Sequence, residues 1–75
     1  MEELLEILSD IRPDVDFENE TQLIDGKILN SFDIISIVGD VNDEFDVEIS
    51  AADLVAENFN SAKAIYAMIC RLQEE

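Results

Sequence analysis

The sequence has no histidine and no tryptophan, and it contains a single cysteine, Cys70. Without histidine, this chain alone cannot assemble a Ser-His or Cys-His catalytic pair, and we expect neither a zinc site nor any other metal site. Cys70 has no partner for an internal disulfide, which favours a reducing, cytoplasmic setting. We therefore expect a protein that is not itself an enzyme.

Positive charge is also scarce, because 4 Lys+Arg stand against 19 Asp+Glu and the formal net charge is −15. A phosphate backbone repels so acidic a surface, and so does an anionic membrane, which argues against nucleic-acid and membrane partners. No apolar run approaches the ~20 residues of a membrane span, and Met1-Glu2-Glu3-Leu4 lacks the basic start of a signal peptide. Basic protein surfaces are the natural complement of this charge.

The length of 75 residues suits one small domain over residues 1–75, and a hydrophobic fraction of 48% is ordinary for a folded chain. Apolar residues recur at helical spacing, which predicts an all-α fold. We expect a small four-helix bundle of three main helices and one short helix, with a long first loop. The predicted helices end near Ile11 or Arg12 before Pro13, run from Ser31 to Phe45, run from Ala51 to Glu57, and begin after a cap at Asn60 or Ser61.

Helix caps give the second helix a defined start. Asn30 is a good N-cap and Asp33 occupies the third helical position, as in a capping box. Leu29 and Ile34 occupy the two positions of a hydrophobic staple. Ser50 and Asp53 form the same pattern before the short helix.

Two connections separate the predicted helices. Residues 14–29 are polar with interspersed apolar side chains, and we expect them to pack on the core through Leu23 and Ile24. Residues 46–49 alternate like a strand but have no obvious partner strand, so we interpret them as an extended connector.

The most informative segments are Leu29-Asn30-Ser31-Phe32-Asp33 and Asp43-Glu44-Phe45-Asp46-Val47-Glu48-Ile49. Together they resemble the acyl carrier and peptidyl carrier protein family. In that family Asp-Ser-Leu opens the second helix, and an acidic helix leads to a Glu-Phe-Asp-Ile-Glu-Ile-like stretch. The resemblance covers nearly the whole chain in length and helix order. Asn30 and Phe32 stand where the family has Asp and Leu.

The resemblance implies that Ser31 carries a covalent 4′-phosphopantetheine, attached by a phosphopantetheinyl transferase. The thiol of that arm would hold an acyl group as a thioester, for enzymes of fatty-acid or polyketide synthesis. An aminoacyl or peptidyl carrier, of nonribosomal peptide or D-alanyl transfer type, is the alternative. We expect a discrete cytoplasmic monomer. Independently of the resemblance, a serine in the first turn of a helix lies where free N–H groups and the helix dipole favour a phosphate.

Five acidic residues are candidates for docking the basic patches of loading and processing enzymes. The alternative is a solvated face that only keeps the protein soluble. The excess of negative charge favours docking for the group as a whole. The five are Asp33, Asp40, Asp43, Glu44 and Glu48.

Seven apolar residues are predicted to form a plain core. The alternative is that they line a cavity between the later helices that shelters an acyl chain. They are Ile35, Val38, Phe45, Leu54, Ile65, Met68 and Ile69.

Two remote alternatives have other functions. One is a calcium-binding loop with the alternating ligand spacing of an EF-hand, although Asn19 replaces its turn glycine and Asp25 its bidentate glutamate. The other is an acidic decoy that mimics DNA. The calcium ligands would be Asp14, Asp16, Glu18, Glu20, Gln22 and Asp25.

Overall fold

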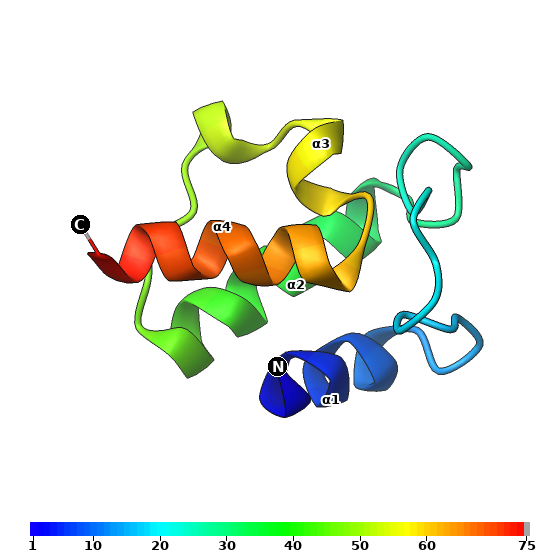
Figure 1. The fold of residues 1–75 in the computed structure, drawn as a ribbon, viewed down its shortest axis with the longest axis horizontal. Helices are drawn as coiled ribbons and strands as arrows, with labels where there is room; N and C mark the ends of the chain where they lie inside the picture. The colour runs from blue at the N-terminus through cyan, green and yellow to red at the C-terminus, as the bar shows by residue number, and fades with distance from the viewer. Residues whose placement is uncertain (75) are drawn as a thin grey trace.

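The computed structural model of the chain describes residues 1–74, and these contain helices and no strand. Its elements are α1 (Glu2–Ile11), α2 (Ser31–Phe45), the 3₁₀ turn η1 (Ala51–Asp53), α3 (Ala56–Phe59) and α4 (Ala62–Glu74). The all-α fold class is thereby confirmed, with three longer helices and one short one (Figure 1).

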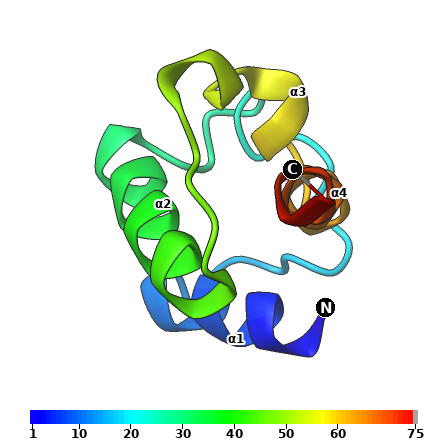
Figure 2. The same cartoon turned by 90° about the vertical axis from the view of Figure 1, so that its left-hand side faces the viewer.

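The helices surround one core. α4 lies in front of α2 in Figure 1, and α1 lies below both. In the view along α4, α3 closes the side opposite α1, between α2 and α4 (Figure 2). The buried apolar residues come from every α-helix, from the long connection and from the connector after α2: Leu4, Leu8, Phe17, Leu23, Leu29, Ile37, Val41, Ile49, Phe59, Ala62, Ile65, Met68 and Ile69.

α1 ends where the sequence predicts. Its fully buried residues Leu4 and Leu8 are four apart and therefore lie on one face. Arg12 follows the helix with φ −136° and ψ 82°, outside the helical region. Pro13 explains this, because a proline ring disfavours helical backbone at the residue before it.

The predicted capping box opens α2. The Asn30 side chain accepts a hydrogen bond from the Asp33 N–H at 2.9 Å, and Asp33 Oδ2 accepts one from the Asn30 N–H at 3.1 Å. The helix ends at Phe45 as predicted, followed by Asp46 in the left-handed region with φ 52°. The connector predicted over residues 46–49 has no partner strand among the described residues, but its first residue, Asp46, is a left-handed turn residue and not extended.

The predicted short helix over Ala51 to Glu57 is wrong as one element. The chain makes the 3₁₀ turn η1, passes through extended backbone at Val55 (φ −122°, ψ 153°), and begins α3 at Ala56. The Ser50–Asp53 contact does form, since Asp53 Oδ2 accepts from the Ser50 N–H at 3.2 Å. That contact stabilises the turn but cannot extend it past Leu54.

The prediction that seven apolar residues form the core is wrong for two of them. Ile35 is 68% exposed and Leu54 is 47% exposed. A helix at the surface buries one stripe, and in α2 that stripe is centred on Ile37 and Val41, which leaves Ile35 on the opposite face. Leu54 is exposed because it follows η1 in the break before α3. Of the other five, Ile65, Met68 and Ile69 are buried, while Val38 and Phe45 are half-buried against the core.

Asn60 anchors the long connection between α1 and α2. Its side-chain oxygen accepts the N–H groups of Ile24 and Asp25, both at 3.0 Å, and its amide donates to Asp25 Oδ2 at 3.0 Å. Its backbone carbonyl accepts the Leu23 N–H at 2.9 Å. Ser61 caps α4, because its hydroxyl accepts from the Ala64 N–H at 3.0 Å. Leu23 is fully buried and Ile24 half-buried, so the connection packs on the core as predicted.

Asn60→Ala should therefore destabilise the fold by about 1–3 kcal/mol, because two loop N–H groups lose their acceptor. Asn19→Ala is the matched control, since the Asn19 amide contacts only the exposed Asp16 carboxylate and its loss should cost within ~0.5 kcal/mol. Urea denaturation of both variants measures the difference. Equal midpoints would show that Asn60 does not anchor the connection.

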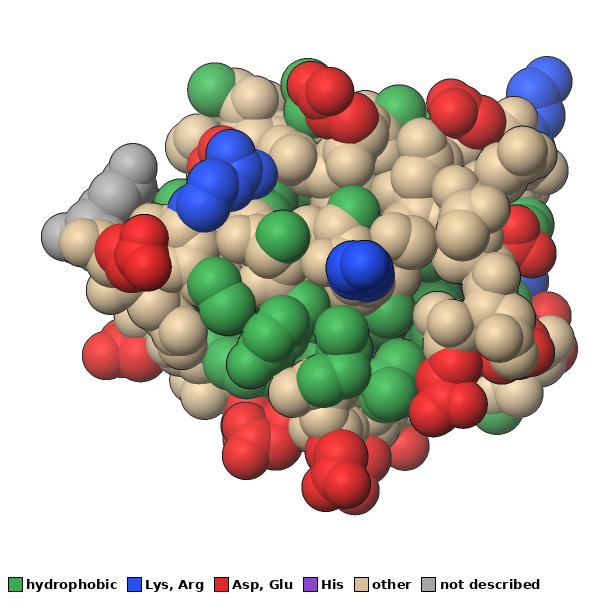
Figure 3. Space-filling model, viewed as in Figure 1, with side chains coloured by type: hydrophobic (Ala, Val, Ile, Leu, Met, Phe, Trp, Pro, Cys, Tyr) green, Lys and Arg blue, Asp and Glu red, His purple; other side chains and the backbone are tan. Residues whose placement is uncertain are grey.

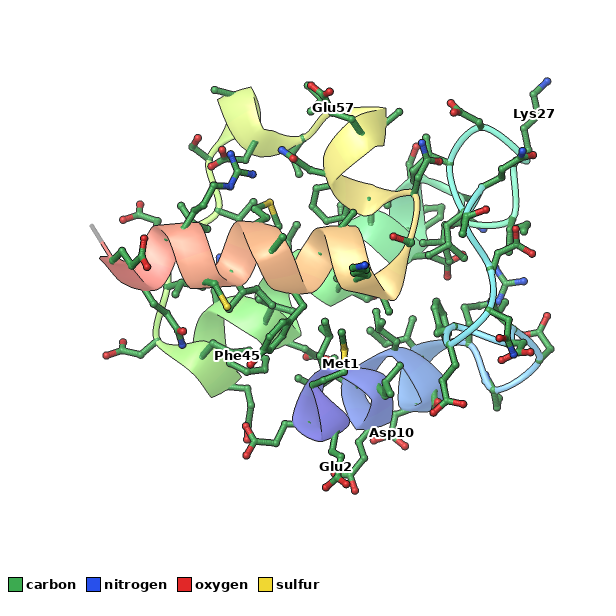
Figure 4. All side chains as sticks on the ribbon, in the orientation of Figure 1. Met1, Glu2, Asp10, Lys27, Phe45 and Glu57 are labelled. Carbon is green, nitrogen blue, oxygen red and sulfur yellow. The ribbon has the colours of Figure 1, made fainter. Side chains whose placement is uncertain are left out.

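Acidic side chains border the face seen in Figure 3, around a band of hydrophobic ones. Glu2, Asp10 and Glu57 project outward from their helices in Figure 4.

With a net charge of −15, the folded state carries a large self-repulsion. Salt should relieve it, because the Debye length falls from ~30 Å at 0.01 M to ~10 Å at 0.1 M. We expect the melting temperature to rise by several degrees over this range, and a flat or falling trend would contradict the prediction.

Candidate functional site

Ser31 is the first residue of α2 and is exposed. The cap of the helix is built by its neighbours Asn30 and Asp33 and does not use the Ser31 hydroxyl. A serine at the beginning of a helix often serves as the N-cap, but in α2 the N-cap is Asn30. The hydroxyl of Ser31 is therefore accessible to another molecule.

The same end of α2 offers hydrogen-bond donors. Among residues 1–74, no hydrogen bond uses the N–H groups of Ser31 or Phe32. These N–H groups carry the positive end of the dipole of a 15-residue helix. A phosphodiester on the Ser31 oxygen would lie beside them, so the local chemistry fits a phosphate-linked group.

Two large apolar side chains near Ser31 are exposed. Phe32 is 80% exposed, and Ile35, one helical turn after Ser31, is 68% exposed. Exposed residues of this size in one place mark a contact surface more often than single scattered ones do. The sequence reasoning missed this surface, because it assigned Ile35 to the core by apolar spacing alone. The four-residue spacing from Ser31 to Ile35 could have indicated a shared exposed face.

A pocket of about 120 Å³ opens between the long connection, α2 and α3. It is slightly smaller than an apolar cavity of ~150 Å³ that holds a benzene molecule. Ile34, which lies three residues after Ser31, belongs to its wall. Of the seven residues predicted for a core or cavity, only Leu54 lines it. The full lining is Ile24, Ile34, Leu54, Val55, Ala56 and Phe59.

The five acidic docking candidates divide into two groups. Asp40, Asp43 and Glu44 on α2, and Glu48 on the connector after it, are all exposed. Asp33 is 9% exposed, and its carboxylate is engaged within the fold. Asp33 therefore presents little charge to a partner, since the second helix turns that residue toward α1.

Arg12 is the residue that engages Asp33, and the sequence reasoning did not single it out. Its Nη1 donates to Asp33 Oδ2 at 2.6 Å and to the Ile28 carbonyl at 3.0 Å. Its Nε and Nη2 donate to the two oxygens of Asp14, each at 3.0 Å. Hydrogen bonding to Asp14 and then Asp33 raises the pKa of Arg12, and the bond to Arg12 lowers the pKa of Asp14.

The residues of the alternative calcium loop are not gathered around one point. Asp14 faces Arg12, Asp16 accepts from Asn19 at 2.8 Å, and Asp25 accepts from Asn60. Within residues 1–74, no group of three or more His, Cys, Asp or Glu residues is placed to hold a metal ion. Asp14, Asp16 and Asp25 are therefore engaged in hydrogen bonds within the fold.

Comparison with known proteins does not assign the chain to a family. No protein-family model matches the sequence, and a search of curated proteins finds no matching relative. Within the part of the chain that the structure describes, no helix has the length and apolar character to cross a membrane.

Proposed function

We propose that this protein is a carrier, modified on Ser31 with 4′-phosphopantetheine. The observation that carries the proposal is the exposed Ser31 hydroxyl at the start of α2, beside the N–H groups of Ser31 and Phe32. The fold supports it, because a bundle of three longer helices and a short one, with a long first connection, is what the resemblance to carrier proteins implies.

In the modification, the Ser31 oxygen would bond to the phosphorus of coenzyme A that bears the pantetheine, and the nucleotide part would leave. The hydroxyl proton passes to a base of the transferase. We expect the transferase to supply this base, because the chain has no histidine and the carboxylate nearest to Ser31 in sequence, Asp33, is bound to Arg12. Once attached, the arm supplies a thiol that carries cargo as a thioester. The chain itself contributes the attachment point and the surface that partners recognise.

The partners of a carrier would be a transferase and the enzymes that load and process the cargo. Phe32 and Ile35 offer an apolar contact beside Ser31, while Asp40, Asp43, Glu44 and Glu48 offer negative charge farther along. A basic rim around an apolar centre would complement this surface. We propose that this carrier acts in the cytoplasm and as a monomer.

The pocket beside α2 favours an acyl cargo over an aminoacyl one. Its lining side chains are all apolar, and Ile34 brings it within one turn of Ser31. An uncharged hydrocarbon gains from burial there, whereas an amino group would lose its hydration. Acyl carriage of the fatty-acid or polyketide type is therefore the form that we propose.

The direct test is to incubate the purified chain with coenzyme A and a broad-specificity phosphopantetheinyl transferase, followed by intact mass spectrometry. We expect a mass increase of one phosphopantetheine per chain. An unchanged mass, with a known carrier loaded in the same reaction, would refute the proposal. Under that outcome, binding to a DNA-processing protein becomes the alternative to test.

A further inference from the structure

The side chain of Arg12 joins four parts of the fold at the beginning of α2. Arg12 follows the end of α1, and its guanidinium reaches Asp14, the Ile28 carbonyl and Asp33. These contacts connect α1 with the beginning and the end of the long connection and with the first turn of α2. The Arg12 side chain is 27% exposed and the Asp33 side chain is 12% exposed, so solvent screens the attraction between their charges only in part.

One carboxylate oxygen of Asp33 accepts both of the hydrogen bonds that its side chain makes. Oδ2 accepts the Arg12 guanidinium at 2.6 Å and the Asn30 N–H at 3.1 Å. Ser31 lies between Asn30 and Asp33, within the turn that the capping box closes. Without Arg12, this mostly buried carboxylate would keep only the backbone N–H as a partner, and hydration would favour turning it outward.

The charge of Asp33 also opposes the chemistry proposed for Ser31. Both residues occupy the first turn of α2, where the helix end attracts negative charge. Asp33 occupies that potential already and would repel a second anion, such as the phosphate of coenzyme A. Arg12 balances this charge and keeps it on the side facing α1.

We propose that Arg12 is a positioning residue for the modification of Ser31. It acts through Asp33, by holding that carboxylate in the capping box and by neutralising its charge. The first turn of α2 then stays ordered, and the positive end of its dipole remains available to an incoming phosphate. This inference rests on the proposed function and adds a residue that neither the sequence pattern nor the resemblance indicates.

The test compares the kcat/KM of loading by one transferase among matched variants. Arg12→Gln should lower kcat/KM roughly tenfold, because Asp33 is left charged and unpaired. Arg71→Gln is the control, since it removes the same unit charge from an exposed arginine that contacts only Asn58, and it should load like the wild type. The double variant Arg12→Gln with Asp33→Asn should regain loading to within about threefold of the wild type, because the introduced amide oxygen can still accept from the Asn30 N–H without a charge.

Amide hydrogen exchange at Asn30 separates this role from a general loss of structure. Arg12→Gln should speed exchange of the Asn30 N–H, and the double variant should restore its protection. If Arg12→Gln does not fold, Arg12→Lys takes its place, with Arg71→Lys as its control. Lysine keeps the positive charge but cannot contact Asp14, Ile28 and Asp33 at the same time. We expect Arg12→Lys to load about threefold more slowly than the wild type.

Two results would overturn the inference alone. One is equal loading of wild type and Arg12→Gln. The other is a folded double variant, with Asn30 protected, that loads as poorly as Arg12→Gln. A wild-type chain that accepts no arm while a known carrier does would instead refute the proposed function, and the inference would fall with it.

Discussion

Ser31→Ala should abolish loading completely while leaving the fold intact. The carrier chemistry requires one hydroxyl, and no other group of the chain can replace it at the start of α2. The substitution should change stability by no more than ~0.5 kcal/mol, because the cap is made by Asn30 and Asp33. Intact mass after incubation with coenzyme A and the transferase measures the first effect, and urea denaturation measures the second.

Ser36→Ala provides the control for this experiment. Ser36 is also an exposed serine of α2, but it lies in the second turn, away from the free N–H groups of the helix end. It should load at the wild-type rate. A Ser31→Ala chain that still gains an arm would show that a different hydroxyl is modified, and peptide mapping would locate it.

Charge reversal on α2 should slow loading by roughly tenfold or more at low ionic strength. Asp40→Lys with Glu44→Lys replaces two negative charges by two positive ones, on exposed positions one turn apart. Attraction between an acidic surface and a basic rim acts chiefly on the association rate, and salt screens it. The loading rates of the double variant and the wild type should therefore converge at high ionic strength.

The matched control is Glu6→Lys with Asp10→Lys on α1. This pair has the same four-residue spacing, the same exposure and a similar position toward the end of its helix, so it changes the net charge equally. Circular dichroism should show preserved helix in both double variants, because lysine is a good helix former. Equal slowing by the two pairs would mean that only net charge matters, and that α2 is a solvated face instead of the docking surface.

Local chemistry made the end of α1 and the beginning of α2 predictable. Pro13 excludes helical backbone at Arg12, and the Asn30–Asp33 capping box needs only residues three apart, so both ends appear where the sequence predicts them. The position of Ser31 in the first turn follows from the same local pattern. The burial of Ile65, Met68 and Ile69 follows from helical spacing.

Apolar spacing failed where more apolar residues exist than one face can bury. Ile35 has the hydrophobicity of a core residue, but Ile37 and Val41 fix the buried face of α2 and leave Ile35 exposed. Leu54 was assigned to a helix that breaks at Val55. Both errors concern the apolar part of the candidate site, which is therefore the part that the sequence described least well.

The sequence by itself determined the all-α class, the caps and the accessible serine, because each depends on residues within one or two turns of each other. Only the tertiary structure decided the partners of Arg12 and Asn60. Arg12 meets Asp33 across 21 residues, and Asn60 meets Ile24 across 36. Such contacts depend on how the helices and the long connection pack, and no local spacing records them. That packing turned Asp33 from a predicted docking residue into the inward partner of Arg12, beneath the turn that presents Ser31.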